Sequence, residues 1–304
     1  MEIIKLQNYE EKRFGTAIAL GNFDGVHIAH QKLISTMVSR ANTGDLIPAT
    51  LLFNIHTKTV LEGKKQQLLS TNEKKIQILN SLGVEIIYEI DFNDELRKLS
   101  PKDFVRNILV DKLNVKLVTV GFDYRFGYKA SGTPQDLKVL GKEYGFEVIV
   151  VDPIFKDDVV SSTRIRGYLR EGDIKRANQM LGYNYSIKGK VIKGRQRGTG
   201  LGFPTANLEV SDDCIIPKIG VYMTNVKLDD KIYLGATSIG VNSTFEEDMS
   251  IKIETHIIDF SGKIYDRVIE LEFIEYLRNE IKFHNIDDLK NQMDNDIKLI
   301  KSKH

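Results

Sequence analysis

The sequence predicts two domains, a doubly wound α/β domain followed by a small antiparallel β-barrel with a terminal helix. The chain has 304 residues, which at about 100–200 residues per domain is enough for two hydrophobic cores. Up to about residue 151, short apolar runs alternate with capped helices. From about residue 185, β-rich segments are joined by short turns instead. We therefore expect a different fold in each half of the chain.

The apolar runs of the first half lack a helical period, as expected for strands of a sheet that is covered on both faces. These runs are Thr16–Leu20, Ala49–Phe53, Val84–Tyr88, Lys116–Val120 and Phe146–Val151. Their alternation with helices predicts a parallel sheet. Sheets of this kind bind ligands beyond the carboxyl ends of their strands.

Two helices between these strands are marked by their caps. Ser100 and Thr133 each place a hydroxyl before a proline at the first helical position, and an aspartate follows in the first turn. Gly145 follows the second helix, where a C-terminal glycine belongs. A further helical stretch over Ser161–Leu181 bridges the two halves. We place the boundary near Tyr183, which gives domains 1–183 and 184–304.

The second half contains β-rich segments separated by short turns of Gly, Asp or Asn. These segments are Ser186–Ile192, Val221–Leu228, Ile232–Ile239, Ile251–Asp259 and Arg267–Ile274. After them, apolar residues recur at helical spacing from Ile286 to Ile300. The pattern predicts an antiparallel sheet or a small closed barrel, covered by a terminal helix.

Composition excludes several classes of protein. Lys and Arg total 43 and Asp and Glu total 42, and the resulting net charge of +1 disfavours a general nucleic-acid binder. The single cysteine, Cys214, excludes an internal disulfide and a cysteine-based structural zinc site. No apolar run approaches the roughly 18 residues of a membrane span, and the N-terminus lacks the pattern of a signal peptide. We expect a cytoplasmic protein with no nucleic-acid or membrane partner, and the sequence leaves open whether it is a homo-oligomer.

The first candidate site is the segment Gly21-Asn22-Phe23-Asp24-Gly25, which directly follows the first predicted strand. Its glycines allow a tight turn, and a helix that we expect to begin near Val26 offers free N–H groups. His27 and His30, three residues apart, share a face of that helix. The arrangement suits a triphosphate, to which the imidazoles can donate hydrogen bonds. From these residues alone, a capped helix with two surface histidines stays open. A metal-binding pair is disfavoured, because no nearby cluster of Cys, His or carboxylate residues completes a coordination shell.

Two more segments carry polar groups that could bind phosphate or another ligand. Ser161–Arg166 places hydroxyls at a helix start, followed by Arg164 and Arg166. It is either a second phosphate clamp or a capped helix with solvated arginines. Gly121–Gly127 follows a predicted strand, at the edge where a doubly wound sheet binds its ligands.

Together and in this order, the three segments resemble the adenylyltransferase module of prokaryotic bifunctional riboflavin kinase/FAD synthetases, within the His-x-Gly-His nucleotidyltransferase superfamily. The resemblance implies a Rossmann-like fold with ATP bound at Gly21–Gly25. It implies that His27 and His30 contact the ATP phosphates during catalysis. The resemblance also implies contacts of Ser162, Thr163 and Arg166 with the triphosphate, of Asp123 with nucleotide or magnesium, and of Arg125 with ATP. His56 and Phe126 are the implied contacts with the flavin.

The chain departs from the family pattern at two places in this half. Ala29 replaces the usual glycine between the two histidines. Phe53-Asn54-Ile55-His56-Thr57 stands where the family has Phe-x-Pro-His-Pro, so both prolines of that loop are replaced while His56 is kept.

The second candidate site is a glycine-rich, basic stretch from Gly189 to Asn207. Such a loop can meet phosphates with backbone N–H groups and positive charge. Thr205 and Asn207 are two apart, so on an extended segment they face the same way and can bind magnesium together with nucleotide phosphates. On composition alone, an ordinary glycine-rich hairpin stays open as the alternative.

Gly202-Phe203-Pro204-Thr205-Ala206-Asn207-Leu208 resembles the signature of riboflavin kinases. The companion segments Gly220–Tyr222, Glu254–Phe260 and Leu277–Phe283 follow in the family's order. The resemblance implies that Gly194 contacts ATP, that Thr205 and Asn207 hold Mg²⁺ with ATP, and that Glu254 is the general base. It implies that Glu254 takes the proton from the terminal ribityl hydroxyl of riboflavin as that hydroxyl attacks the γ-phosphoryl group.

The resemblance therefore implies a bifunctional enzyme that phosphorylates riboflavin to FMN with ATP and adenylylates FMN to FAD, releasing pyrophosphate. Its small-molecule partners are riboflavin, FMN and ATP, and Mg²⁺ is expected in both steps. Two alternatives remain. In one, a single module is active, with the kinase favoured by the altered 54–57 loop. In the other, the chain is a flavin-binding regulatory protein without turnover.

Overall fold

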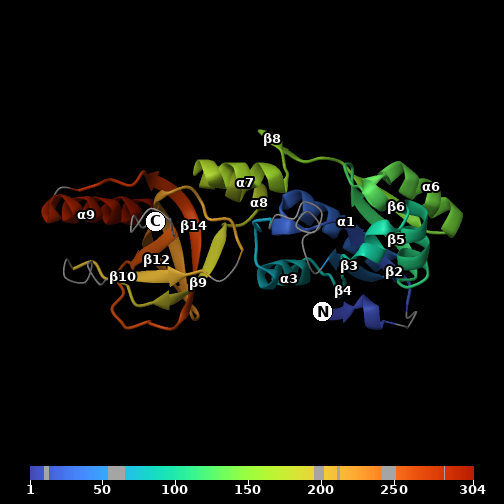
Figure 1. Cartoon of the computed structure of the whole chain (residues 1–304), viewed down its shortest axis with the longest axis horizontal. Coiled ribbons are helices and arrows are strands. Elements are labelled where there is room, and N and C mark those ends of the chain that lie inside the picture. The colour runs from blue at the N-terminus through green and yellow to red at the C-terminus, as the bar shows by residue number, and fades with distance from the viewer. Residues whose placement is uncertain (10–13, 54–65, 195–201, 211–212, 242–250, 284) are drawn as a thin grey trace. The chain divides into compact units, whose positions relative to one another are not determined.

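The computed structural model describes residues 1–9, 14–53, 66–194, 202–210, 213–241, 251–283 and 285–304. Contacts among these residues divide the chain into two compact units. Unit 1 consists of Met1–Gln67 and Asn72–Ser161, and unit 2 consists of Leu68–Thr71 and Ser162–His304. Figure 1 shows the elements of each unit in chain order.

Unit 1 is built on a parallel sheet. In the described residues its six strands lie in the order β1-β4-β3-β2-β5-β6, and every pairing between them is parallel. The strands are β1 (Glu2–Lys5), β2 (Thr16–Leu20), β3 (Ile47–Phe53), β4 (Ile86–Ile90), β5 (Val115–Gly121) and β6 (Glu147–Val151). The chain runs outward from β2 through β3 and β4 on one side, then returns to β5 and β6 on the other. The topological switch point, where such sheets bind ligands, therefore lies between β2 and β5.

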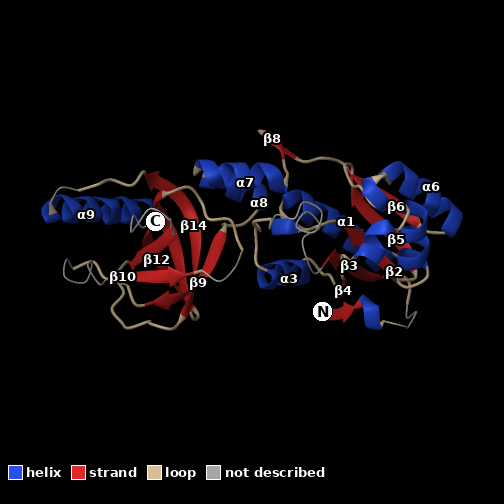
Figure 2. Ribbon diagram, in the orientation of Figure 1, coloured by secondary structure: helices blue, strands red, loops and turns tan. Residues whose placement is uncertain are grey.

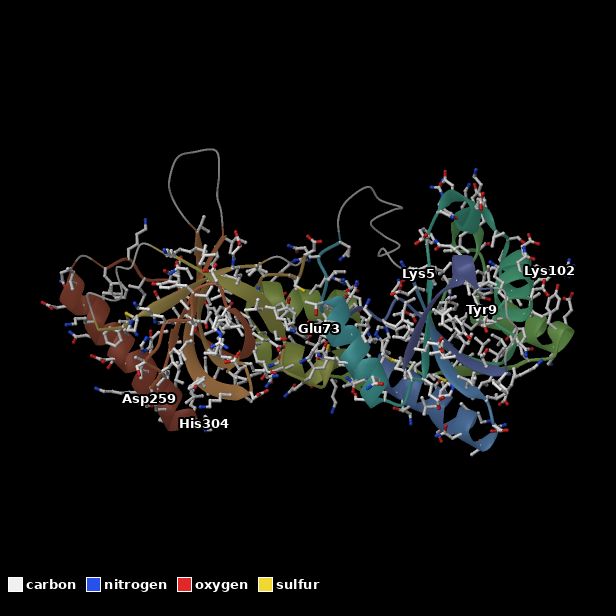
Figure 3. The ribbon with its side chains drawn as sticks, turned by 90° about the horizontal axis from the view of Figure 1, so that it is seen from below. Lys5, Tyr9, Glu73, Lys102, Asp259 and His304 are labelled. Atoms are coloured by element: carbon white, nitrogen blue, oxygen red, sulfur yellow. The ribbon has the colours of Figure 1, made fainter. Side chains whose placement is uncertain are left out.

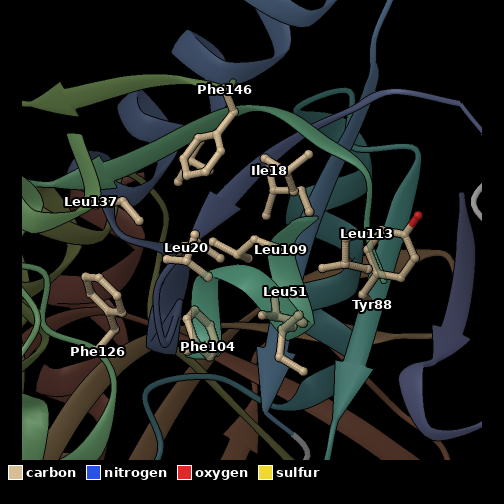
Figure 4. Close-up of a cluster of buried hydrophobic side chains, with 14 of the residues drawn as sticks. Ile18, Leu20, Leu51, Tyr88, Phe104, Leu109, Leu113, Phe126, Leu137 and Phe146 are labelled. Carbon is tan, nitrogen blue, oxygen red and sulfur yellow. The ribbon is translucent and has the colours of Figure 1, made fainter. Parts of the chain in front are cut away.

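Helices cover both faces of this sheet (Figure 2). On one face, α1 and α3 contribute Leu33, Met37 and Leu79 to an apolar cluster. On the other face, Phe104 and Leu137 belong to a second cluster with Leu20, Leu51 and Tyr88 (Figure 4). The helical elements of unit 1 are η1 (Leu6–Asn8), η2 (Asp24–Val26), α1 (Ile28–Thr43), α3 (Asn72–Ser81), α4 (Asp94–Lys98), α5 (Pro101–Asp103), the π-helix η3 (Phe104–Val110), η4 (Tyr128–Ala130) and α6 (Pro134–Tyr144). A short hairpin of β7 (Phe155–Lys156) and β8 (Asp158–Val159) completes the unit. The predicted doubly wound α/β fold is confirmed.

Unit 2 contains a closed antiparallel barrel, as the sequence predicts. Its strands follow one another around the barrel in the order β10-β13-β12-β11-β14-β9. They are β9 (Ser186–Ile192), β10 (Thr205–Glu209), β11 (Gly220–Leu228), β12 (Lys231–Val241), β13 (Ile251–Ile257) and β14 (Val268–Arg278). Inside the barrel, Thr224, Thr237 and Thr255 are fully buried, and their hydroxyls form a chain with oxygen distances of 2.8 and 2.9 Å. Buried hydroxyls are tolerated there because they satisfy one another.

In the described residues of unit 2, three helices and the short segment Leu68–Thr71 accompany the barrel. The terminal helix α9 (Ile286–Lys303) is held on β14 by Arg278, which donates to both carboxylate oxygens of Asp296, with the shortest contact at 2.7 Å. Near its end, Lys301 lies 2.8 Å from Asp259; Figure 3 labels Asp259 and the C-terminal His304. The segment Leu68–Thr71 also belongs to this unit. The Leu68 N–H donates to the Asp213 backbone carbonyl, and the Leu68 carbonyl accepts from the Ile215 N–H, so Leu68 forms a β-bridge with Cys214.

The single helical stretch expected over Ser161–Leu181 is divided into two helices, α7 (Ser162–Glu171) and α8 (Ile174–Leu181). Gly172 adopts φ +83° between them, and the Asp173 side chain accepts the Arg176 N–H to cap α8. A left-handed glycine followed by a cap ends one helix and starts another. Both helices group with the barrel in unit 2. The division of the chain by activity, 1–183 and 184–304, stays a prediction.

No helix in the described ranges has both the length and the apolar character that crossing a membrane requires.

Candidate active sites

The glycine-containing segment after β2 forms a strained turn. Phe23 and Val26 adopt φ of 45° and 34°, and Gly25 adopts φ +74°. Positive φ is rare for side-chain-bearing residues and unfavourable for a β-branched valine, so such backbone persists only where the surroundings enforce it. Here Phe23 and Val26 are fully buried in the cluster under α1, and Asp24 is 2% exposed. The turn fixes where the chain enters α1, directly at the switch point of the sheet.

The two histidines lie at that entry, but not as the sequence alone predicts. The α-helix begins at Ile28 rather than near Val26, because η2 occupies Asp24–Val26. His27 is therefore the N-cap of α1, and its Nδ1 accepts the backbone N–H of His30 at 3.4 Å. The two imidazoles stack, with ring centroids 3.6 Å apart and planes 15° from parallel. His30 also meets the edge of the Phe23 ring at 5.2 Å.

Burial keeps both imidazoles uncharged. It lowers the pKa of His27 from 6.5 to about 4, against a weaker opposing effect of its backbone hydrogen bond. Burial is also the main reason why the pKa of His30 lies well below its ordinary value, with smaller contributions from the charges of His27 and Lys75. Since Nδ1 of His27 accepts a hydrogen bond, the proton of its neutral ring is on Nε2. His27 therefore retains a ring N–H that can donate to an anion.

The loop after β5 emerges next to this turn, because β5 is the neighbour of β2. Asp123 and Arg125 are exposed, and the Arg125 guanidinium donates to the Tyr124 carbonyl at 2.9 Å. Phe126 is 5% exposed and stacks on Tyr124 within the apolar core. Asp123 and Arg125 thus lie at the carboxyl end of β5 and Phe126 packs in the core, while the predicted ligand contacts of all three stay predictions. His56 lies outside the described residues.

The segment Ser161–Arg166 forms the start of α7, which begins at Ser162 as its hydroxyls predict. Thr163 is exposed and Arg166 is 6% exposed. The Arg164 guanidinium lies 4.5 Å from the centroid of the Tyr168 ring, a cation–π contact. The helix belongs to unit 2, and the predicted phosphate contacts of Ser162, Thr163 and Arg166 stay predictions.

The residues predicted for the second site are brought together on the barrel. Asn207 of β10 pairs in register with Glu254 of β13, and Thr205 pairs with His256. Along β13, Ile253, Thr255 and Ile257 are buried, whereas the residues between them are half-buried. Because side chains alternate along a strand, Thr205, Asn207 and Glu254 share the outer face of the barrel wall. One face thus presents a hydroxyl, a carboxamide and a carboxylate.

Contacts hold two of these groups in place. Asn207 is 8% exposed, and Gly194 lies so close that a Cβ at that position would come within 2.7 Å of the Asn207 carboxamide oxygen. The Glu254 carboxylate pairs with Lys252 at 2.7 Å, on the same strand and the same face. Among the described residues, no group of three or more His, Cys, Asp or Glu side chains is placed to hold a metal ion.

Three charged residues next to these sites were not predicted from the sequence. Lys252 pairs with Glu254, and the Glu280 carboxylate lies against Gly240, where a Cβ would clash with it. Lys75 of α3 is close enough to Asp24 and His30 to affect the titration of the histidine. The position of Lys252 could have been predicted from the sequence, because Lys252 and Glu254 are two apart on a strand and therefore share a face. No sequence pattern indicates Lys75 or Glu280, since each lies on a segment far in sequence from the site that it joins.

Comparisons with known proteins identify a family for each half of the chain. A family model described as FAD synthetase matches residues 9–164, and one described as riboflavin kinase matches residues 181–304. Proteins named bifunctional riboflavin kinase/FMN adenylyltransferase are similar over nearly the whole chain. The one from Listeria monocytogenes is 40% identical over 92% of this chain and 89% of its own length. The one from Bacillus subtilis is 36% identical over 94% of this chain and 92% of its own.

A solved structure has the same fold. The crystal structure named a macrolide-efflux protein, from Streptococcus pneumoniae, aligns with a TM-score of 0.90 and 29% identity. The alignment covers 99% of this chain and 98% of that one.

Proposed function

The chain belongs to the bifunctional riboflavin kinase/FMN adenylyltransferase family, and on that premise we propose which residues carry each reaction. The enzyme phosphorylates riboflavin to FMN with ATP. It also transfers AMP from ATP to FMN, which forms FAD and releases pyrophosphate. Its substrates are therefore riboflavin, FMN and ATP.

Adenylyl transfer is assigned to the histidine pair, and one observation carries this assignment: His27 and His30 stack at the N-terminus of α1, at the switch point of the sheet. A helix N-terminus favours phosphate through its free N–H groups and its dipole. The Nε2–H of the neutral His27 ring donates to a phosphoryl oxygen. As the bond between the α-phosphorus and the bridging oxygen breaks, charge grows on the departing pyrophosphate, and donors that are already in place stabilise it without reorganising.

The other residues of this half act on substrate position. We assign the segment Gly21–Gly25 to ATP binding through its backbone N–H groups and the Asn22 side chain. Asp123 and Arg125, at the end of the neighbouring strand, are assigned to the nucleotide, and Ser162, Thr163 and Arg166 to its phosphates. The flavin of FMN is assigned to His56 and Phe126. These roles rest on the family motifs.

Phosphorylation of riboflavin is assigned to the outer face of the barrel. Glu254 acts as the general base: it accepts the proton of the terminal ribityl hydroxyl while that oxygen attacks the γ-phosphorus of ATP and ADP leaves. Its register partner Asn207, with Thr205 and Gly194, holds the phosphates on the adjacent strand. The ion pair with Lys252 restrains the Glu254 carboxylate on the face that the ATP phosphates would occupy.

Thr205 and Asn207 fit a magnesium ion that is bound together with ATP. Their oxygens are hard ligands of the type Mg²⁺ prefers, and Mg²⁺ commonly takes few protein ligands while phosphates and water complete its shell. The Asn207 oxygen is held in a fixed position, because Gly194 leaves just enough room for the carboxamide. When bound, the ion neutralises charge on the phosphates. We assign Mg²⁺ to both reactions and place the enzyme in the cytoplasm, where both reactions draw on ATP.

A product time course tests these assignments. The enzyme is incubated with riboflavin and Mg-ATP, and in parallel with FMN and Mg-ATP, and FMN, FAD and pyrophosphate are resolved. FMN should appear first and FAD after it, and FMN supplied directly should yield FAD and pyrophosphate. An enzyme that made FMN but no FAD would have only its kinase module active, and the assignment of the histidine pair would be withdrawn.

A further inference from the structure

Lys75, from a different part of the chain, acts electrostatically on His30 of the histidine pair. Lys75 is half-buried on α3, one helical turn before the fully buried Leu79. The face of α3 that carries Leu79 and Ile76 packs in the same apolar cluster as Phe23 and Val26. Lys75 shares that face, because residues four apart on a helix lie one above the other. The packing of α3 against η2 thus places an ammonium group among apolar side chains next to Asp24.

The charges in this cluster act on one another. The Asp24 carboxylate, 2% exposed, attracts the Lys75 ammonium and thereby opposes the effect of burial, which is the larger one and lowers the pKa of Lys75. The positive charge of Lys75 in turn helps to hold the pKa of His30 below its ordinary value. Asp24, His27, His30 and Lys75 therefore form one electrostatic group at the start of α1.

The charged groups around His30 can be named element by element. Helix α1 packs on β2, β3, β5 and η2. Strands β2 and β3 carry no titratable side chain, and that of β5 is Lys116, near the strand's amino end. From η2 the charged group is Asp24, α3 carries Glu73, Lys74 and Lys75, and the loop after β5 carries Asp123 and Arg125. Of these, Lys75 acts electrostatically on His30, and Asp24 acts on Lys75.

We propose that Lys75 is a positioning residue for adenylyl transfer: its ammonium group compensates the Asp24 carboxylate, so that the ATP phosphates approach the histidine pair without a repelling anion beside it. This inference rests on the assignment of the phosphates to His27 and His30. Without Lys75, the buried Asp24 carboxylate would lose a compensating positive charge next to the most highly charged part of the substrate, and like charges at close range are strongly unfavourable. Lys75 acts through Asp24 and His30.

The test compares Lys75→Met, Lys75→Arg and Lys74→Met in the full-length enzyme. Methionine keeps the length and apolar stem of lysine but removes its charge, whereas arginine keeps the charge. Lys74→Met removes the same charge from the neighbouring position of α3, and Lys74 is not among the charges that act on His30. The imidazole of His30 is titrated by NMR without nucleotide, its signal being assigned by its loss in His30→Ala. FAD formation from FMN and riboflavin phosphorylation are measured on the same preparations.

In Lys75→Met, the midpoint of the His30 titration should move to higher pH. The KM for ATP in FAD formation should rise at least about tenfold, with a smaller change in kcat, because the lost interaction acts on the binding of charge. Lys75→Arg should restore both values. Lys74→Met should resemble the unaltered enzyme, and riboflavin phosphorylation should be unchanged in all three variants.

An unchanged His30 titration in Lys75→Met would overturn the proposal, even if FAD formation fell, because a merely structural lysine gives that result. A shifted titration with unaltered KM would overturn it as well. Failure of the underlying assignment is recognised separately: His30→Ala would then still form FAD at the normal rate, whatever the titration showed.

Discussion

The imidazole rings of His27 and His30 lie 3.6 Å apart in a near-parallel stack, while Nδ1 of the first accepts the backbone N–H of the second. The contact fixes both rings at the first turn of α1. It also gives the two ring nitrogens of His27 different roles: Nδ1 accepts the hydrogen bond that caps the helix, and Nε2 is available to a ligand.

Replacing His30 by alanine should impair FAD formation alone. Removal of one placed donor from a site that stabilises developing charge typically costs about 10²–10³ in rate. We therefore expect kcat for FMN adenylylation to fall by that order, with riboflavin phosphorylation unchanged. The two rates are measured by chromatographic separation of FMN and FAD. A comparable loss of kinase activity would contradict the assignment of this pair to one reaction.

The buried histidines should make the protein less stable in mild acid. In the unfolded chain His27 binds a proton below its ordinary pKa of 6.5, but in the folded chain only below about 4. Between these values the unfolded state holds more protons, so the free energy of unfolding falls as the pH drops from 6.5 towards 4. For His27 the loss approaches roughly 3 kcal/mol below both values.

His27→Asn isolates this effect, because asparagine still accepts the N-cap hydrogen bond but does not titrate in this range. Urea unfolding at a series of pH values should give a flatter profile for the variant between pH 6.5 and 4. Equal slopes for the two proteins would show that His27 does not cause the acid sensitivity.

Glu254→Gln should abolish most riboflavin phosphorylation while flavin binding is kept. A general base contributes about 10²–10⁴ in rate, and glutamine is nearly the same shape but cannot take a proton. FAD formation from supplied FMN should continue. Glu272→Gln is the matched control, since Glu272 is also a barrel glutamate paired with a lysine, Lys227. Turnover of Glu254→Gln equal to that of the control would exclude the role as base.

A single added methyl group at Gly194 should weaken ATP binding to the kinase. The new Cβ would lie within 2.7 Å of the Asn207 oxygen, so the buried carboxamide must leave its position. Overpacking of this kind costs roughly 1–3 kcal/mol, and we expect KM for ATP in riboflavin phosphorylation to rise about tenfold. Gly167→Ala adds the same group where no atom lies within 4 Å, and its kinase KM should be normal. Equal KM values would mean that Asn207 does not contact the ATP phosphates.

Asp296→Ala should release the terminal helix from the barrel. The Asp296 side chain is 7% exposed and accepts three contacts from Arg278 and one from Gln292. Removing one partner of such a pair leaves the other charge uncompensated and costs about 3–5 kcal/mol when the pair is buried. A fall in thermal midpoint, with earlier proteolysis within α9, is the expected result. An unchanged midpoint would mean that α9 is held by its apolar contacts alone.

Much of the fold was readable from the sequence, since its signals are local. Strands β2 and β9 have the predicted bounds, because apolar content marks the first and alternation the second. Ser100 and Thr133 cap their helices as expected, the latter in a full capping box. Strand β1 was not predicted, because its side chains are mostly exposed at the sheet edge and give no apolar run.

The sites were predictable as sets of residues but not as geometry. The motifs indicated His27 and His30, whereas their stacking depends on the left-handed backbone at Phe23 and Val26, for which the sequence carries no signal. From the sequence alone, Lys75 is a lysine on an amphipathic helix and would be predicted to be solvent-exposed. Its position near the histidines follows only from the packing of α3. In contrast, the pairing of Asn207 with Glu254 follows once the barrel register is fixed.

The insertion of Leu68–Thr71 into unit 2 constrains how the gene can be rearranged. The chain passes between the units after residues 67, 71 and 161, so no single break separates them. A fragment ending at residue 161 would expose Leu69 and Ser70, which are 1% and 4% exposed in the whole chain. The complementary fragment would lack the partner that pairs beside Cys214. Fission into two monofunctional genes would therefore require compensating substitutions in both products.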